Sequence, residues 1–200
     1  MTETRRKFFY GWWIVFACLV CLFIAYGSRY SFGVFFKPMA KEFGWTRAMT
    51  AAAFTISTIL LGLVSPFIGK CVDKFGAKIV IIIGAFIAGL GYGLIYLTES
   101  LVQFYIFYSV VVTIGIAASA LVPCNAVTAR WFTKQRATAM GIISIGMGIG
   151  PFLLINIAGW MITTYGWRMS FVLLGIIVFI VISAISYFLI RNDPQEMGLQ

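Results

Sequence analysis

Two long runs without an ionised side chain, Ala48–Gly69 and Ile79–Thr98, flank a short segment that is dense in charge. The segment Gly69–Lys78 carries one aspartate and three lysines. Each flanking run is long enough to cross a hydrocarbon core of about 30 Å as a helix. The pattern therefore predicts two membrane-spanning helices joined by a tight turn at the membrane surface.

The composition of the whole chain agrees with a bilayer environment. Hydrophobic residues make up 62% of the sequence and charged residues 10%, whereas a soluble domain has roughly 25% charged residues. We expect an all-α integral membrane protein, because backbone groups in lipid must be bonded within their own segment and the runs lack the alternation of barrel strands. The uncharged runs predict six transmembrane helices, at residues 12–36, 46–69, 77–98, 101–129, 137–164 and 167–190. Residues 1–191 then form one six-helix bundle, and 192–200 begin a cytoplasmic loop.

The distribution of basic residues predicts the orientation. The net charge is +9, and ten of the fifteen basic residues fall on one side of the predicted topology. By the positive-inside rule, both termini and the Asp73 segment are cytoplasmic in a multi-pass protein of the cell membrane. In a soluble protein this charge would suggest nucleic acid, but here the expected partner is the lipid bilayer. The basic stretch Arg5–Lys7 also resembles a secretory signal, yet the following run is long and lacks a small-residue cleavage site, so we expect a retained first helix.

Residues that would support metal, redox or enzymatic chemistry are sparse. Cys18 and Cys21 share a face of the first helix, but cysteines in lipid-spanning helices usually behave as small hydrophobes, and Cys71 and Cys124 supply no second ligand pair. The sequence contains no histidine, no phosphate-binding loop and no nucleophile elbow. It therefore predicts no cofactor, no metal site and no enzyme activity.

Two pairs of similar segments indicate an internal repeat. Trp45–Arg47 is echoed by Phe132–Lys134, and Phe75–Lys78 is echoed by Tyr165–Arg168, at offsets of 87 and 90 residues. Because three helices separate each pair, the echoes lie on opposite membrane faces, as in two inverted three-helix repeats. The alternative is coincidence, since aromatic, glycine and basic residues are common at membrane boundaries.

The Gly69–Lys78 segment resembles the loop signature of the major facilitator superfamily. It reads glycine, three residues, aspartate, a basic residue, an aromatic residue, glycine, and a basic residue two positions on. Six further segments resemble the branch of monocarboxylate carriers and oxalate-formate antiporters: Tyr10–Trp13, Tyr30–Pro38, Gly44–Arg47, Arg130–Phe132, Gly166–Arg168 and Asp193–Gly198. Such carriers have twelve helices, so the chain resembles an N-terminal six-helix half. The resemblance implies either a truncated chain or a pathway completed by a second half or by self-association.

The resemblance implies a secondary active transporter of a small organic anion, such as the monocarboxylates lactate and pyruvate. Transport would proceed by alternating access, with proton symport or with exchange for a counter-anion. A non-transporting membrane subunit or sensor that keeps the fold is the alternative, and it predicts complex formation without flux. An intramembrane enzyme is disfavoured, because the sequence offers no constellation of nucleophile, base and metal.

Arg29 is the candidate substrate-binding residue, because it is the only charge that lies away from the ends of a predicted span. Burying an arginine there costs about 2.5–3.5 kcal/mol on insertion scales. Tyr26, Arg29 and Tyr30 share one helical face, where a guanidinium and two phenols would bind a carboxylate. Alternatively, Arg29 extends outward to the interface, from a position about 12 Å deeper than Lys37.

The fourth and fifth helices supply further candidates. Ser119 shares a face with Tyr105 and Ser109, and it precedes Pro123, whose missing N–H frees the Ser119 carbonyl and predicts a local bend. As an alternative to substrate binding, Ser119 serves only for packing. The glycines of the fifth helix predict close packing against another helix; they are Gly141, Gly146, Gly148 and Gly150, before Pro151.

The last candidate is a conformational switch. The resemblance implies that the Asp73 loop latches the two halves on the cytoplasmic side, with Asp73 paired to a base such as Arg130. The alternative is a solvated turn. The residues assigned to the switch are Gly69, Asp73, Lys74, Gly76, Lys78 and Arg130.

Overall fold

The computed structural model describes residues 10–192; the predictions for Arg5–Lys7 and for the loop after Asn192 lie outside this range. The described chain is helical almost throughout, and six of its helical stretches have the length and composition to cross a membrane. The predicted fold class is therefore confirmed. The six stretches are Gly11–Phe43, Arg47–Phe75, Ala77–Leu97, Leu101–Trp131, Arg136–Tyr165 and Trp167–Leu189.

The first stretch consists of two helices. Helix α1 (Gly11–Tyr30) passes through the single turn residue Ser31 into α2 (Phe32–Phe43). Helix α2 continues beyond Phe36, where the uncharged run ends, because Phe32, Phe35 and Met39 are buried along it. It ends at Gly44, whose φ of +68° is a left-handed conformation that glycine adopts at little cost.

The second stretch is the single helix α3 (Arg47–Phe75), which begins at Thr46, whose hydroxyl accepts a hydrogen bond from the Met49 amide. Helix α4 (Ala77–Leu94) follows after Gly76 alone and ends in the short turn η1 (Ile95–Leu97). The prediction that Gly69–Lys78 as a whole forms the turn is therefore wrong. Asp73 and Lys74 belong to the last turns of α3, where a lysine is favoured by the helix dipole.

The fourth stretch is the least regular. It comprises α5 (Leu101–Phe104), the π-helical segment η2 (Tyr105–Val112), α6 (Thr113–Ser119) and α7 (Leu121–Trp131). The helix is interrupted at Ala120, with φ −121° and ψ −113°, three residues before Pro123. The predicted bend between Ser119 and Pro123 is thus confirmed, whereas nothing in the sequence indicated the wide turns of η2.

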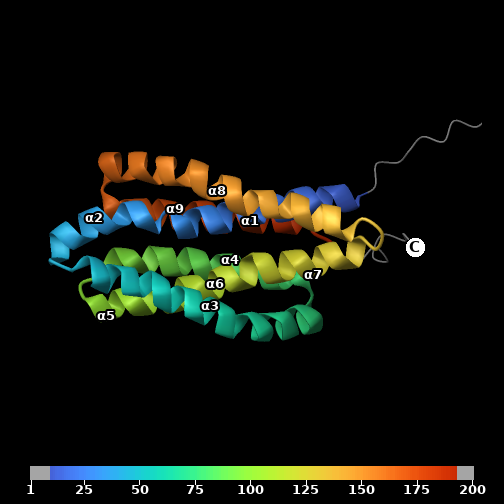
Figure 1. The fold of residues 1–200 in the computed structure, drawn as a ribbon, viewed down its shortest axis with the longest axis horizontal. Helices are drawn as coiled ribbons and strands as arrows, with labels where there is room; N and C mark the ends of the chain where they lie inside the picture. The colour runs from blue at the N-terminus through green and yellow to red at the C-terminus, as the bar shows by residue number, and fades with distance from the viewer. Residues whose placement is uncertain (1–9, 193–200) are drawn as a thin grey trace, which may run out of the picture.

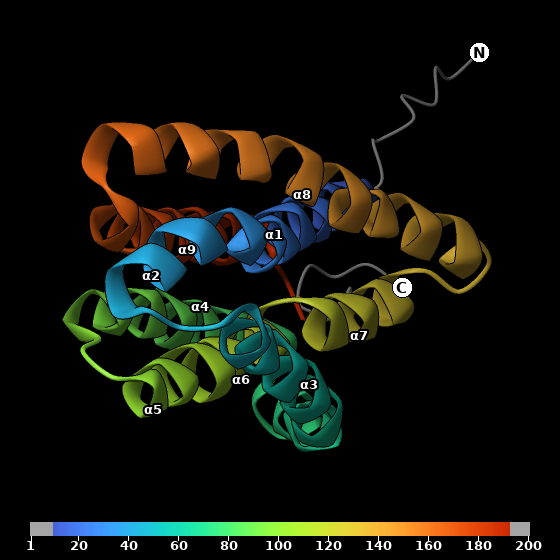
Figure 2. The same ribbon diagram turned by 60° about the vertical axis from the view of Figure 1, so that its left-hand side comes forward.

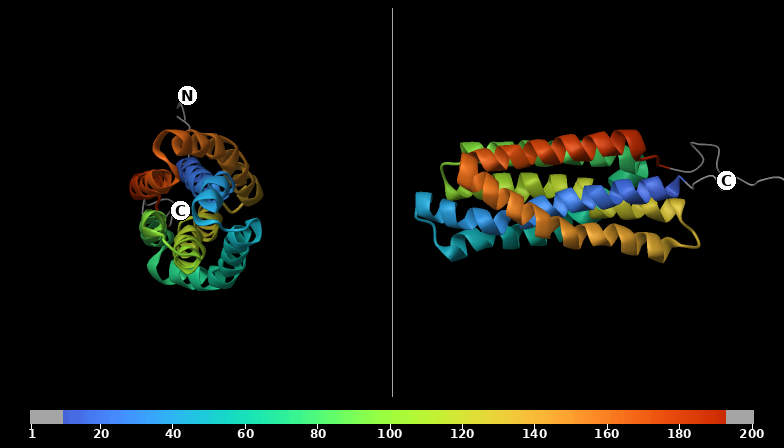
Figure 3. Two further views of the ribbon diagram at one scale, coloured as in Figure 1. Left: turned by 90° about the vertical axis from the view of Figure 1, so that its left-hand side faces the viewer. Right: turned by 90° about the horizontal axis from the view of Figure 1, so that it is seen from above.

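The last two stretches are α8 (Arg136–Tyr165) and α9 (Trp167–Leu189). Helix α1 packs most extensively on α8, and α4 packs on α9. In Figure 1, α8 lies along the upper edge and α3 along the lower edge, with α1 and α2 below α8 and with α6 and α7 above α3. The turned view in Figure 2 and the end-on view in Figure 3 place α4 and α9 together on the other side of the bundle.

The two glycine turns support the inverted repeat. Gly76 joins α3 to α4 with φ +82° and ψ +151°, and Gly166 joins α8 to α9 with φ +80° and ψ +161°. Positive φ at these positions favours glycine over other residues. The two turns lie 90 residues apart in the chain and at opposite ends of the bundle (Figure 1). We call these ends the Asp73 end and the Glu42 end, after an acidic residue in each.

Glycines bring α8 into backbone contact with α1. A Cβ built on Gly146 or Gly150 would collide with the backbone of Leu19 or Phe23 in α1. A Cβ on Gly141 or Gly148 meets no atom within 4 Å. The predicted close packing is therefore confirmed for Gly146 and Gly150, whereas Gly141 and Gly148 do not pack closely against another helix.

Candidate functional site

Arg29 lies inside the bundle, near the end of α1, with only 3% of its surface exposed. Its Nη2 donates hydrogen bonds to the hydroxyls of Ser57 (3.3 Å) and Thr58 (2.9 Å), both in α3. Its side chain therefore extends to α3 inside the bundle, and it does not extend outward to the membrane interface. Among the described residues, Arg29 has no carboxylate partner.

A chain of hydroxyl groups surrounds this guanidinium. The hydroxyl of Thr113 donates to Ser57 at 2.7 Å, and the phenol of Tyr108 donates to the carbonyl oxygen of Arg29 at 3.3 Å. Tyr108 belongs to η2 and Thr113 opens α6, so the π-helical segment brings the fourth stretch against α1 and α3. Such wide turns occur frequently at functional sites. We call Arg29, Ser57, Thr58, Tyr108 and Thr113 the Arg29 cluster.

Aromatic rings form the other side of the Arg29 cluster. The guanidinium carbon lies 4.8 Å from the ring centroid of Phe54 and 5.8 Å from that of Tyr30, within the range of cation–π attraction. Tyr26 stacks on Tyr30 with centroids 6.2 Å apart. Tyr26 is buried, whereas Tyr30 is 43% exposed. The structure thus brings together three of the four predicted substrate-binding residues, with one ring open to the surface.

Ser119, the fourth candidate, is not part of this cluster. It ends α6, six residues after Thr113, which corresponds to roughly 9 Å along a helix. Its hydroxyl is fully buried and has no hydrogen-bond partner among the described residues. The predicted face of the fourth helix is also turned inward, because Ser109 donates to the carbonyl of Ala53 in α3. No hydrogen bond joins Ser119 to Arg29 in the described chain.

The predicted switch residues meet at the Asp73 end. Arg130 Nη2, in the last turn of α7, lies 3.5 Å from Asp73 Oδ1. The Asp73 side chain is 78% exposed, so this ion pair contributes little to stability. Lys78 is held through its backbone, whose N–H donates to Asn192 Oδ1 at 3.0 Å and so satisfies the first turn of α4.

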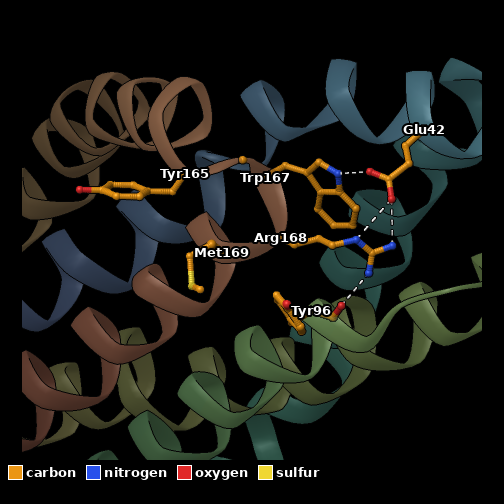
Figure 4. Close-up of a pocket in the computed structure, with 7 residues that line it drawn as sticks. Glu42, Tyr96, Tyr165, Trp167, Arg168 and Met169 are labelled. Atoms are coloured by element: carbon orange, nitrogen blue, oxygen red, sulfur yellow. Dashed lines mark hydrogen bonds and ion pairs between the residues drawn. The ribbon is translucent and has the colours of Figure 1, made fainter.

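A second charged cluster, at the Glu42 end, was not predicted as a site. Trp167 Nε1 donates to one carboxylate oxygen of Glu42 at 2.6 Å, and Arg168 Nη2 donates to the other at 3.0 Å. Arg168 Nη1 also donates to the carbonyl of Tyr96 at 2.6 Å. Figure 4 shows that these groups converge from α2, η1 and the start of α9 beside a surface pocket that includes Tyr165.

The two charged clusters occupy corresponding places in the inverted repeat. Glu42 closes α2 and Arg130 closes α7, 88 residues later. Each residue pairs with a charge beside the glycine turn of the other repeat, Glu42 with Arg168 and Arg130 with Asp73. In the Glu42 pair the helix end supplies the acid and the glycine turn supplies the base, whereas in the Arg130 pair the helix end supplies the base. Each end of the bundle therefore carries one such ion pair, which we call a clamp.

The cysteines are all free thiols in the structure. Cys124 lies beside Cys18, with each sulfur about 4 Å from the other residue's carbonyl oxygen, a neighbour that the sequence did not reveal. Cys21 lies 3.7 Å from the Ser186 hydroxyl. These three thiols are buried and fill space between helices, whereas Cys71 in α3 is partly exposed.

Sequence reasoning missed most partners of Arg29. The hydroxyls of Ser57 and Thr58 adjoin each other in an uncharged run, and that pair of polar residues was the available signal. Tyr108 gave no signal, because its position depends on the wide turns of η2. Glu42 and Asn192 also gave none, since their partners lie more than 100 residues away in the chain.

Six helical stretches with the length and composition to cross a membrane characterise a multi-pass membrane protein. Residues 18–200 match the Major Facilitator Superfamily, and the chain belongs to this family. The family and the relatives described below are transporters rather than enzymes, as the sequence predicts.

Monocarboxylate transporters are among the similar proteins. Monocarboxylate transporter 4 of Rattus norvegicus is 30% identical over 169 residues, which cover 83% of this chain and 35% of that protein. Monocarboxylate transporter 14 of Homo sapiens is 28% identical over 166 residues, which cover 83% of this chain and 32% of that protein. The chain therefore spans about a third of the length of these relatives.

A solved structure shares the fold. A bacterial homologue of the human lysosomal transporter Spinster, in an inward-facing and unoccupied conformation, matches with a TM-score of 0.78. The match covers 97% of this chain and 45% of that protein, at 18% identity. At this identity the likeness concerns the fold alone.

Proposed function

We propose that this chain forms one six-helix unit of a secondary transporter for a small organic anion, specifically a monocarboxylate such as lactate or pyruvate. The similarity to monocarboxylate transporters supports the substrate class. Transport is coupled to a proton or to exchange with a counter-anion, and it proceeds by alternating access. Because no acidic residue lies close to Arg29 in the described chain, a coupling carboxylate belongs to another part of the pathway.

The observation that carries the proposal is the buried guanidinium of Arg29, which has no carboxylate partner within residues 10–192. Its Nη2 bonds only to neutral hydroxyls, and its Nε is buried without a hydrogen-bond partner. A buried charge that lacks a counter-ion is costly. A carboxylate substrate would neutralise the charge and accept charge-assisted hydrogen bonds from the guanidinium.

The exposed neighbours of Arg29 give the substrate a route of approach. Tyr30 and Thr58 are exposed, and both belong to helices of the face formed by α1, α3 and α8. We propose that a second six-helix unit, from the same protein or from a second copy, covers this face and completes the pathway. In this arrangement Asp73 and Arg130 form a latch on the cytoplasmic side of the cell membrane, where both termini also lie.

The experiment is substrate binding to Arg29 variants. Charge-assisted hydrogen bonds contribute about 1.5–3 kcal/mol, so Arg29→Gln weakens monocarboxylate binding about 10- to 100-fold. Arg29→Lys keeps the charge but loses the planar fork, and it gives an intermediate affinity. The affinity is measured by scintillation proximity with radiolabelled lactate on purified protein.

Lys37→Gln is the matched control, because Lys37 is an exposed cation further along the same stretch of helix. It leaves the affinity for lactate unchanged. The proposed role of Arg29 is refuted if Arg29→Gln lowers the melting temperature while the affinity stays at the wild-type value. That outcome would show that Arg29 only joins α1 to α3.

A further inference from the structure

An apolar groove lies near the Asp73 end, between α3, α4 and α6. Its volume is about 310 Å³, which is at the lower end of the range for small-molecule pockets, about 300–1,000 Å³. Helix α3 contributes Ile68, Cys71 and Phe75, α4 contributes Ile79 and Ile83, and α6 contributes Ile114. The surface inside the groove is almost entirely hydrocarbon.

The groove opens to the outside of the bundle. Phe75, Ile79 and Ile83 each leave about half of their surface exposed. They lie in or beside the membrane-spanning stretches of α3 and α4, so the exposed apolar surface adjoins lipid chains. An apolar groove on this side is filled by a hydrocarbon chain more readily than by water.

Cations mark one end of the groove. Lys74 Nζ lies 5.1 Å from the ring centroid of Phe75, which lines the groove. Lys70 lies one turn earlier on α3, and both lysines are exposed. The neighbouring acid, Asp73, is paired with Arg130. The charge available at the end of the groove is therefore positive.

We propose that this groove, the Lys74 groove, binds one acyl chain of an anionic phospholipid whose phosphate group contacts Lys74 and Lys70. A hydrocarbon slot with Lys74 at its end and Lys70 one helical turn away is complementary to an amphiphile with a negative headgroup. A packed helix from another protein would fill the slot but would not require the cationic end. This site is separate from the Arg29 cluster and does not depend on which anion is transported.

The test uses the full chain in nanodiscs of phosphatidylcholine that contain a trace of photoactivatable lipid. Two probes carry a diazirine on the same acyl chain, one with a phosphatidylglycerol headgroup and one with a phosphatidylcholine headgroup. Adducts are mapped by peptide mass spectrometry. The phosphatidylglycerol probe labels residues 68–87 at least about fivefold more than the phosphatidylcholine probe. Lys74→Gln lowers this ratio of labelling about fivefold.

Lys134→Gln is the control, because Lys134 is an exposed lysine that lines a different pocket with Trp131 and Phe132. It leaves the labelling of both probes unchanged. Ile83→Trp, which fills the groove, reduces the labelling by both probes. Equal labelling by the two headgroups, or adducts located away from residues 68–87, would overturn the proposal.

A second measurement needs no variant. Cys71 lines the groove and is the partly exposed thiol, whereas the other three thiols are buried. Replacing phosphatidylcholine with phosphatidylglycerol in the nanodisc therefore slows alkylation of Cys71 by N-ethylmaleimide about fivefold, through occupancy of the groove. An alkylation rate that is the same in both lipids would also count against the site.

Discussion

The contact between α1 and α8 can be tested with one added methyl group. In Gly150→Ala, the new Cβ would lie 2.9 Å from the carbonyl carbon and 3.0 Å from the Cα of Phe23. These are backbone atoms, so the two helices must separate. Overpacking of this kind costs about 1–3 kcal/mol. Alanine recovers about 0.5–1 kcal/mol of helix preference over glycine, so the net loss is at most about 2.5 kcal/mol and about 1 kcal/mol in the middle of the range.

A loss of about 1 kcal/mol lowers the melting temperature by about 2–4 °C for a chain of this length. The assay is thermal unfolding in detergent, followed by tryptophan fluorescence. Gly148→Ala is the matched control, because a Cβ at Gly148 meets nothing within 4 Å. It keeps or raises the melting temperature. The reasoning is refuted if Gly150→Ala and Gly148→Ala have the same effect.

The two clamps and the cap of α4 give three further predictions. Glu42→Gln removes the carboxylate that joins Trp167 and Arg168, and it lowers the melting temperature by about 2–4 °C, whereas Glu99→Gln does not, because the Glu99 carboxylate has no hydrogen bond or ion pair among the described residues. Asp73→Asn leaves the melting temperature within about 1 °C because its ion pair is exposed, but it changes the uptake rate; an unchanged rate would argue against the latch. Asn192→Ala costs about 0.5–2 kcal/mol of folding free energy, as for other helix caps, and Asn192→Asp, which keeps the acceptor, loses less when both are compared by thermal unfolding.

The six spans could be predicted because the bilayer imposes a simple rule on the sequence. A helix that crosses lipid excludes charge over a fixed length, and the uncharged runs reveal that length directly. The ends of the helices were harder to predict from the sequence. Helix α2 extends to Phe43 and α3 to Phe75, with Met39 and Val72 buried in the bundle near their ends.

For the candidate site, the sequence predicted only those neighbours that lie on the same helix as Arg29. The face shared by Tyr26, Arg29 and Tyr30 follows from helical periodicity, and the structure places these residues together. The hydroxyls that bind Arg29 come from another helix, and the pairing of helices depends on packing that periodicity does not encode. The role proposed for Ser119 has no support from the cluster, because Ser119 lies six residues after Thr113 along α6.

The measurement that tests the central claim most directly is uptake of labelled lactate, pyruvate, formate and oxalate into proteoliposomes. The protein is expressed from its complete coding sequence, as wild type and as Arg29→Gln, and a pH gradient or an internal counter-anion is imposed. We predict saturable uptake of a monocarboxylate that rises with the gradient or the counter-anion and is at least about tenfold weaker in Arg29→Gln. Absence of uptake by a folded preparation, or uptake unaffected by Arg29→Gln, would contradict the account.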